Sequence, residues 1–110
     1  MTTITVRKDK NGSYRGFCCM GHAEYARRGR PDILCAAISA LTIGTANCLE
    51  ELAGERIKVT ADEENAFFQC DFESILQEKS RFLVDSMVFS LENISREYGR
   101  KYLQVKFEEV

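Results

Sequence analysis

Two stretches of alternating polar and apolar residues flank an Asn-Gly pair near the start of the chain. Thr2 to Lys8 and Tyr14 to Gly21 both alternate with a period of two, which is typical of β-strands. Asn11-Gly12 lies between them and favours a tight hairpin, because both residues tolerate a positive φ. The chain is therefore expected to begin with a β-hairpin. His22, the only histidine, follows the second strand directly, and connecting segments of this kind often carry functional side chains.

A first long helix is expected from about Ile33 to Ala53. Pro31-Asp32 precedes it, and the Asp32 carboxylate can cap the free N–H groups of the first turn. Gly54 is expected to end the helix, as a C-terminal glycine commonly does. Much of the helix surface carries small side chains, namely Ala36, Ala37, Ser39, Ala40, Gly44, Thr45 and Ala46. Small side chains let another backbone approach closely, so this surface predicts either tight packing within the fold or a subunit interface.

A second hairpin is expected in the middle of the chain. Ile57 to Ala61 and Ala66 to Phe72 alternate as strands do, and Asp62 to Asn65 between them is typical of a turn. A final strand is expected from Leu103 to Phe107, where apolar residues alternate with Gln and Lys. These segments bring the number of predicted strands to five.

A second long helix is expected to start at Ser74 and to end at Gly99. Gln77, three residues after Ser74, would complete a capping box at its start. Apolar residues at helical spacing follow, which is typical of a side that faces a core. This stripe consists of Leu76, Leu83, Met87, Leu91, Ile94 and Tyr98.

The order β-β-α-β-β-α-β predicts an α+β fold. We expect a two-layer sandwich of about five mainly antiparallel strands with two long helices on one face. A length of 110 residues favours a single domain over residues 1–110, and the composition is that of an ordinary soluble protein. No apolar run is expected to approach the roughly 20 residues that cross a bilayer. Residues 1–12 lack the apolar region of a signal peptide, so the expected location is the cytoplasm.

The charge of the chain argues against a nucleic-acid-binding protein. The formal net charge is -2, so there is no overall basic field, and direct nucleic-acid binding is not expected. Arg27, Arg28 and Arg30 nevertheless cluster in the segment before the first helix. They are either solvated loop charges or a contact surface for an acidic or nucleic-acid-bound partner.

Five cysteines are scattered along the chain, at positions 18, 19, 35, 48 and 70. Their odd number and the lack of a secretory signal argue against a disulfide framework. One histidine and separated thiols do not give the ligand spacing of a zinc site, so no metal is expected. Most of these cysteines are expected to be small buried apolar residues.

Cys35 lies three residues after the expected N-cap of the first helix. There the helix carries about half a positive charge and free N–H groups, which favour a thiolate and could stabilise an oxyanion. An imidazole from His22 nearby would complete the arrangement of a cysteine nucleophile and its base. Asp32 caps the helix, orients His22, or does both. Ser39, one turn after Cys35, either hydrogen-bonds the site or packs as a small residue. A first-turn cysteine is often structural, so these residues alone leave both interpretations open.

The stretch from Gly21 to Leu41 resembles the signature of the bacterial ribosomal-processing cysteine protease family, Prp. That family shows Gly-His-Ala at a strand end, a glycine-containing loop, and Asp-Ile-[Val/Leu]-Cys-Ala-Ala-[Val/Ile]-Ser-Ala-Leu at the start of a helix. The matching residues are Gly21-His22-Ala23, Gly29 and Asp32-Ile33-Leu34-Cys35-Ala36-Ala37-Ile38-Ser39-Ala40-Leu41. The motif is long, and the length and element order agree too, so the resemblance covers essentially the whole chain.

The resemblance implies a cytoplasmic, homodimeric cysteine endopeptidase that uses no cofactor. Family members remove a short N-terminal extension from large-subunit ribosomal protein twenty-seven, a step of ribosome assembly in bacteria that make the extended form. By this resemblance Cys35 is the nucleophile and His22 the base, and a mobile loop between them closes over the peptide. The supporting positions are Gly21, Asp32 and Ser39, and those of the substrate loop are Ala23, Arg27, Arg28, Gly29 and Arg30.

One departure from the family pattern lies at the end of the loop. Arg30-Pro31 stands between Gly29 and Asp32, where the family usually has a single residue. Because proline fixes φ, loop closure and peptide preference are expected to change more than catalysis.

Two other functions remain open. The main alternative is a non-catalytic ribosome-associated binding protein, with Arg27, Arg28 and Arg30 contacting rRNA or a ribosomal protein. A redox role for Cys18-Cys19 is disfavoured, because neighbours on a strand point to opposite faces and a bond between them is strained.

Overall fold

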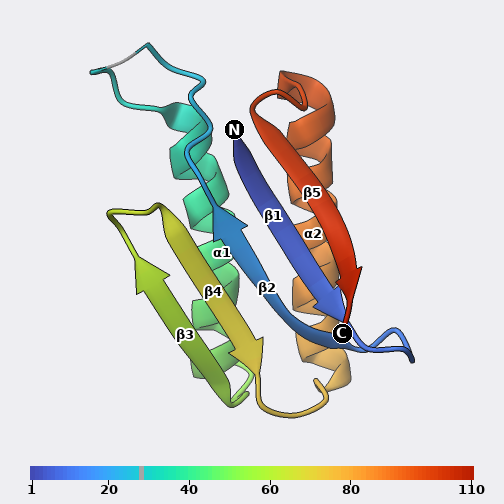
Figure 1. Ribbon diagram of the computed structural model, residues 1–110. Coiled ribbons are helices and arrows are strands. Elements are labelled where there is room, and N and C mark those ends of the chain that lie inside the picture. Colours follow the sequence, from blue (N-terminus) through green and yellow to red (C-terminus); the bar gives the residue numbers. More distant parts are fainter. Residues whose placement is uncertain (28) are drawn as a thin grey trace.

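The computed structural model describes residues 1–27 and 29–110 (Figure 1). Its elements follow the predicted order β-β-α-β-β-α-β. They are β1 (Thr2–Lys8), β2 (Tyr14–Met20), α1 (Ile33–Glu51), β3 (Ile57–Asp62), β4 (Phe67–Phe72), α2 (Glu78–Tyr98) and β5 (Leu103–Glu109). The predicted strands agree with these bounds within two residues at each end.

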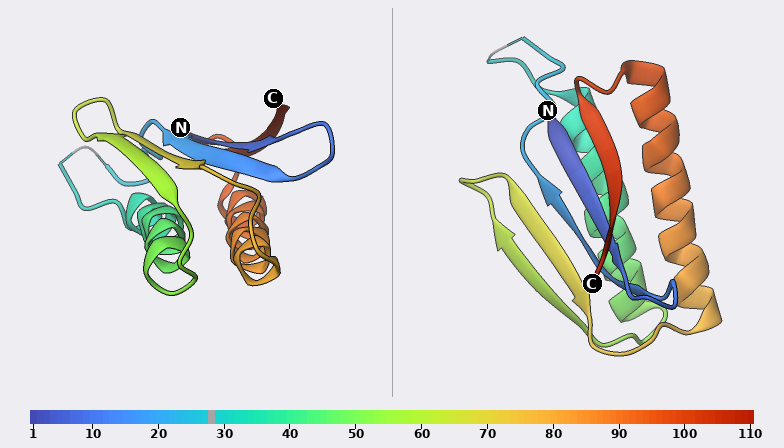
Figure 2. Two further views of the ribbon diagram at one scale, coloured as in Figure 1. Left: turned by 90° about the horizontal axis from the view of Figure 1, so that it is seen from below. Right: turned by 45° about the vertical axis from the view of Figure 1, so that its right-hand side comes forward.

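The strands form one mixed sheet in the order β3-β4-β2-β1-β5. The β1–β2, β2–β4 and β3–β4 pairs are antiparallel, whereas β1 and β5 are parallel. The parallel pair arises because α2 carries the chain back along the sheet, so β5 starts at the same end as β1 (Figure 1). Both helices cover one face of the sheet (Figure 2). The predicted two-layer α+β fold with a mainly antiparallel sheet is confirmed.

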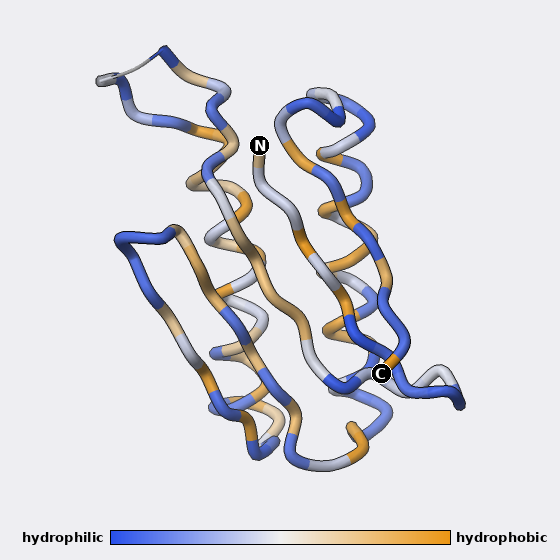
Figure 3. The backbone as a smooth tube through the Cα atoms, viewed as in Figure 1, coloured by the Kyte–Doolittle hydropathy of each residue, from blue (hydrophilic) through white to orange (hydrophobic). Residues whose placement is uncertain are grey.

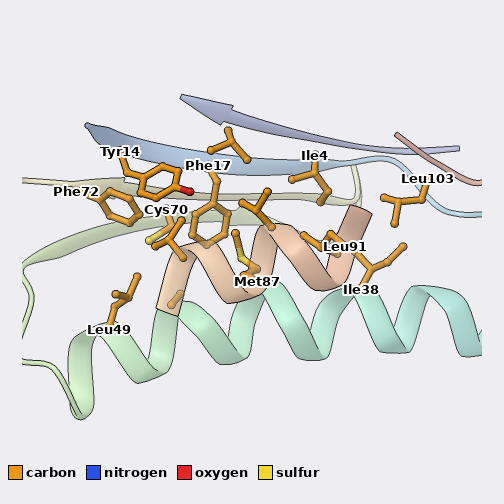
Figure 4. Packing of buried hydrophobic residues seen from close by; sticks show 14 of the residues in the cluster. Ile4, Tyr14, Phe17, Ile38, Leu49, Cys70, Phe72, Met87, Leu91 and Leu103 are labelled. Atoms are coloured by element: carbon orange, nitrogen blue, oxygen red, sulfur yellow. The ribbon is translucent and has the colours of Figure 1, made fainter. Parts of the chain in front are cut away.

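The core lies between the sheet and the two helices. Phe17 on β2 is fully buried, and its ring packs against Phe68 and Phe72 of β4 with centroid separations of 6.3 and 6.1 Å. Leu49 of α1 and Leu91 of α2 are also fully buried and lie in the same apolar layer (Figure 4). Removal of this apolar surface from water is the main force that holds the helices on the sheet.

One side of α1 is buried, and the other is apolar yet exposed. Ile33 and Ile43 on the outer side are 66% and 42% exposed. By length and hydropathy alone α1 could cross a membrane, so the expectation that no apolar stretch approaches that length was wrong. Its buried residues recur at helical spacing and mark it as a core helix instead. They are Leu34, Ile38, Thr42, Ala46 and Leu49.

The helix α1 ends at Glu51, two residues before the predicted Ala53.

The start of α2 differs from the prediction. The helix begins at Glu78 with Gln77 as its N-cap, so the predicted start at Ser74 was wrong. The backbone N–H of Gln77 donates to Oε2 of Glu55, and its Nε2 donates to the Ala53 carbonyl, both at 3.0 Å. These bonds hold Gln77 in an extended conformation outside the helix. Their partners lie 22 and 24 residues earlier, so the local pattern could not indicate them.

The apolar stripe predicted for α2 lies only partly on its buried side. Leu91 is fully buried as expected, but Tyr98 is 39% exposed. Ser95 is buried instead, and its hydroxyl donates to the Leu103 carbonyl at 2.7 Å. This hydrogen bond satisfies the buried hydroxyl and joins α2 to the start of β5.

We expect Glu55→Gln to lower the free energy of unfolding near neutral pH by about 1.5–3 kcal/mol, the usual range for a hydrogen bond to a charged group. Burial acts to raise the pKa of Glu55, but the nearby Ser80 hydroxyl, the hydrogen bond from the Gln77 backbone N–H and the positive charge of Lys79 outweigh it and lower that pKa. A carboxylate with a lowered pKa in the folded state stabilises the fold above its unfolded-state pKa. This stabilisation is lost as the pH falls through the folded-state pKa.

Urea unfolding of the wild type and Glu55→Gln from about pH 7 to about pH 3 tests this expectation. The difference in unfolding free energy should be full near neutral pH and should shrink below about pH 4. Glu51→Gln, an exposed substitution with the same change of charge, is the matched control. An equal loss in both variants, or a Glu55 effect that does not depend on pH, would contradict the expectation.

Candidate active site

One pocket brings together the predicted base, the predicted nucleophile and the nearby serine. His22, Cys35 and Ser39 all line a hollow of about 300 Å³ where the end of β2 meets the first turns of α1 and the start of β4. His22 and Ser39 are exposed, and Cys35 is half-buried. The rest of this Cys35 pocket is mostly apolar and consists of Thr2, Gly21, Ile38, Ile43, Ala61, Glu63, Ala66, Phe67 and Phe68.

Asp32 is the N-cap of α1, as predicted. Its Oδ1 accepts hydrogen bonds from the backbone N–H groups of Leu34 and Cys35, at 3.0 and 3.1 Å. The N–H of Ala36 donates to the Asp32 carbonyl at 3.0 Å. Three N–H groups of the first turn are therefore already engaged. While these bonds hold, the three groups are not free to bind an oxyanion.

A different backbone group faces the sulfur of Cys35. The N–H of Ala23 donates to Sγ at an N-to-S distance of 3.2 Å. Ala23 directly follows His22 and is fully buried in the core, so packing holds this donor in place. A donor in this position stabilises negative charge that develops on the sulfur. Ala23 was predicted as part of the substrate loop, and only the folded backbone shows that its N–H points into the site.

The second carboxylate oxygen of Asp32 ties the loop after β2 to the helix. Oδ2 accepts hydrogen bonds from the N–H groups of Tyr25 and Ala26, at 2.9 and 3.3 Å. Burial acts to raise the pKa of Asp32, but backbone hydrogen bonds from Cys35, Ala26, Tyr25 and Leu34 outweigh it and lower that pKa. We call this set of four hydrogen bonds the Asp32 brace. Both oxygens are used by the brace, and within residues 1–27 and 29–110 no hydrogen bond joins Asp32 to His22.

Tyr25 anchors the same part of the loop from the other side. Its ring meets Tyr98 and Tyr102 edge to face, with centroid separations of 5.5 and 5.1 Å. This geometry is the one that aromatic pairs prefer. The Glu24 carboxylate lies 3.8 Å from the N-terminal ammonium of Met1. The first half of the loop is therefore fixed against β1 and the turn between α2 and β5.

Gly21 sets the direction in which the chain leaves β2. Its φ is +93°, and a Cβ at this position would lie 2.5 Å from the Met1 carbonyl oxygen. Its N–H donates to the Ala66 carbonyl at 2.9 Å, and its carbonyl accepts from the Thr2 hydroxyl at 3.1 Å. Only glycine combines this backbone conformation with so close an approach. The two hydrogen bonds fix the point from which His22, the next residue, enters the pocket.

The rest of the predicted substrate loop lies outside the pocket. Arg27 and Arg30 are exposed, and the Arg30 N–H donates to the Arg27 carbonyl at 3.0 Å to close a turn. Gly29 lies within this turn with a φ of +84°. Arg28 lies outside the described residues. The two described arginines do not line the Cys35 pocket.

The other cysteines have different surroundings. Burial raises the pKa of Cys70 to about 12 and that of Cys19 to about 11, so both stay protonated near neutral pH. Only Cys70 is fully buried, so the expectation that most cysteines are buried was wrong for the half-buried Cys18, Cys19 and Cys48. All five thiols are free.

In the described part of the chain, no three His, Cys, Asp or Glu side chains gather as metal ligands would.

Comparison with known sequences gives consistent matches. The sequence model of the family described as cysteine protease Prp matches residues 1–104. The chain is 30% identical over 102 residues to the ribosomal processing cysteine protease Prp of Bacillus subtilis (strain 168). The matched region covers 89% of this chain and 90% of that protein. It is 26% identical over 99 residues to the protein of the same name from Staphylococcus aureus (strain Mu50 / ATCC 700699), with coverage of 90% and 92%.

Comparison with solved structures gives the same fold. The crystal structure of the ribosomal processing protease Prp from S. aureus with a covalently linked product peptide superposes with a TM-score of 0.88 at 24% identity. The superposed region covers 98% of this chain and 100% of the S. aureus chain. A second S. aureus structure, in complex with a substrate peptide, gives a TM-score of 0.85 at 23% identity with the same coverage. The sequence match spans nearly the whole chain and the fold agrees, so this chain belongs to the cysteine protease Prp family.

Proposed function

We propose that this chain is a cysteine endopeptidase in which Cys35 is the nucleophile and His22 the general base. The observation that supports this most directly is that both residues line one pocket while the Ala23 N–H points at the Cys35 sulfur. The half-buried thiol lies beside apolar walls, and the exposed imidazole can exchange protons with water. A cysteine and a histidine suffice for acyl transfer.

The proposed reaction begins when His22 takes the proton of the Cys35 thiol and the thiolate attacks the scissile carbonyl carbon. We assign the Ala23 N–H, 3.2 Å from Sγ, as a donor to the resulting oxyanion, in place of the first-turn groups that Asp32 occupies. His22 then protonates the leaving amine as the C–N bond breaks, which leaves a thioester on Cys35. A water molecule that gives a proton to His22 hydrolyses the thioester and restores the thiol. We assign Ser39, which lines the same pocket, as a hydrogen-bond partner of the peptide.

We propose that the substrate is the extended N-terminus of large-subunit ribosomal protein twenty-seven, which this enzyme cuts in the cytoplasm during ribosome assembly. Relatives of this chain are named as ribosomal processing proteases, and one of them has been solved with a substrate peptide. The apolar lining formed by Ile38, Phe67 and Phe68 suits a peptide that presents a bulky apolar side chain. The proposal involves no direct contact with nucleic acid.

We further propose that the chain forms a homodimer through the outer face of α1 and α2. A groove of about 260 Å³ between the helices is lined by Ala40, Leu41, Gly44, Thr45, Cys48, Leu83, Ser86 and Met87. Phe82 and Phe89 lie one turn on either side of Ser86 and are 73% and 65% exposed. Apolar residues beside an apolar groove on one face can pair with the same face of a second copy across a two-fold axis.

Substitution of the proposed nucleophile should abolish peptide cleavage. We expect Cys35→Ala to show no cut, and His22→Ala to lose at least about a hundredfold in rate, the usual contribution of a general base. The substrate is a peptide that spans the extension junction of the ribosomal protein from the same organism, and mass spectrometry identifies the products. Cys18→Ala, a half-buried cysteine on β2 that lines neither the Cys35 pocket nor the proposed interface groove, is the matched control and should keep the wild-type rate.

Cleavage by Cys35→Ala, or equal loss in Cys18→Ala, would contradict the assigned nucleophile. A wild-type protein that folds and binds the peptide without cutting it would favour the ribosome-associated binding protein instead. In that case the exposed Arg27 and Arg30 would be the next residues to substitute.

The Asp32 brace should matter for activity more than for helix stability. Asn caps helices about as well as Asp, but its single acceptor oxygen cannot serve both the first turn and the loop. We expect Asp32→Asn to stay within about 1 kcal/mol of the wild type in unfolding free energy and to lose about tenfold or more in cleavage rate. Urea unfolding and the peptide assay together check this. A stable Asp32→Asn variant with full activity would show that the loop does not need the brace.

The proposed dimer should have twice the 12.5 kDa mass of the chain. Phe89→Ser should shift it toward the monomer, because it removes an exposed aromatic side chain from the proposed interface. Phe107→Ser on β5, 51% exposed and away from that face, is the matched control. Light scattering after size-exclusion chromatography measures the mass. A monomeric wild type at micromolar concentration, or an equal effect of both variants, would contradict the proposed interface.

A further inference from the structure

One charged side chain lies in an otherwise uncharged pocket wall. Of the described residues that line the Cys35 pocket, Glu63 alone carries a formal charge near neutral pH when His22 is neutral. The lining also includes the apolar side chains of Phe67, Phe68 and Ile43, and the Glu63 side chain itself is exposed at the edge of the pocket. A peptide bound against these walls excludes part of the water beside the Glu63 carboxylate, which weakens the screening of its charge.

The turn that carries Glu63 uses its other polar groups internally. The Asp62 carboxylate accepts hydrogen bonds from the Asn65 backbone N–H at 3.3 Å and from its Nδ2 at 2.6 Å. The Ala66 N–H donates to the Glu63 carbonyl at 3.2 Å. Across residues 1–27 and 29–110, the Glu63 carboxylate itself has neither a hydrogen-bond donor nor an ion-pair partner. Glu64, the next residue, is exposed and does not line the pocket.

The turn is also fixed in relation to the proposed catalytic residues. The Ala66 carbonyl accepts a hydrogen bond from the N–H of Gly21 at 2.9 Å, and Gly21 directly precedes His22. Figure 3 shows the contrast along the chain, with a hydrophilic β3–β4 turn that leads into the apolar start of β4. The backbone of the turn that carries Glu63 is thus held beside the site, although the carboxylate itself is exposed.

We infer that Glu63 is a specificity-determining residue that selects peptides with a lysine or arginine side chain near the scissile bond. The inference rests on the proposed function and names the class of peptide that the site accepts. A cationic side chain that reaches Glu63 gains a charge partner, whereas an anionic one meets a like charge in a partly apolar pocket. The carboxylate therefore favours one class of peptide and disfavours the other.

The test compares peptides that share one cleavage junction and differ at a single position. Lys, Gln or Glu is placed in turn at each position that flanks the scissile bond, and kcat/KM is measured with the wild type, Glu63→Gln, Glu63→Lys and Glu64→Gln. At one of these positions the kcat/KM of the wild type should be about fivefold higher for the Lys peptide than for the Gln peptide, the upper range for an exposed ion pair. Glu63→Gln should remove this preference, and Glu63→Lys should reverse it in favour of Glu. Added salt should weaken it.

Glu64→Gln is the matched control, because it removes the same charge from the same turn outside the pocket. A wild type that cuts with no charge preference at any position would overturn the inference and leave the proposed function intact. Loss of the preference in Glu64→Gln as large as in Glu63→Gln would also overturn it, because a diffuse acidic field would then be the cause.

Binding measurements separate this inference from the proposed function. Fluorescence anisotropy of the same peptides with Cys35→Ala, and with Cys35→Ala combined with Glu63→Gln, reports recognition without turnover. Lys-dependent binding that needs Glu63, in a protein whose wild type cuts nothing, would overturn the protease function and support the role of Glu63. Binding of Lys and Glu peptides with equal affinity, without cleavage, would overturn both.

Discussion

The carboxylate of Asp32 accepts four backbone hydrogen bonds, and the geometry around Cys35 depends on them. Two donors belong to the first turn of α1 and two belong to the loop that leaves β2. The negative charge also lies at the positive end of the helix, where it is stabilised. Because the pKa of Asp32 is lowered, the brace stays charged at neutral pH. One short side chain therefore joins the loop that follows His22 to the helix that carries Cys35.

The features that sequence patterns predicted well are those determined by residues close together in the chain. The period of two located the strands, and Asn11-Gly12 located the first hairpin, because both signals act within a few residues. The same holds for Asp32, whose capping bonds reach only two and three residues ahead. The start of α2 was missed because Glu55 and Ala53, far earlier in the chain, hold Gln77 outside the helix.

The candidate site was also predictable only in part. The residue types of His22, Cys35 and Ser39 left a structural role open, and the resemblance to the Prp signature indicated a shared site; all three line one pocket. The Ala23 N–H could not be predicted, since its direction depends on the positive φ of Gly21 and on the burial of Ala23. The packing of Tyr25 on Tyr98 could not be predicted either, because it joins two segments far apart in the chain.

The start of β1 forms part of the wall around the site. Thr2 lines the Cys35 pocket, the Met1 carbonyl lies against Gly21, and the Met1 ammonium faces Glu24. Since β5 runs parallel to β1, Val110 emerges at the opposite end of the sheet, where its N–H donates to the Lys8 carbonyl. An affinity tag fused ahead of Met1 would replace the ammonium with a neutral amide and place extra chain beside the pocket. A tag after Val110 would leave these contacts unchanged, so the choice of tagged terminus affects what an assay of this protein measures.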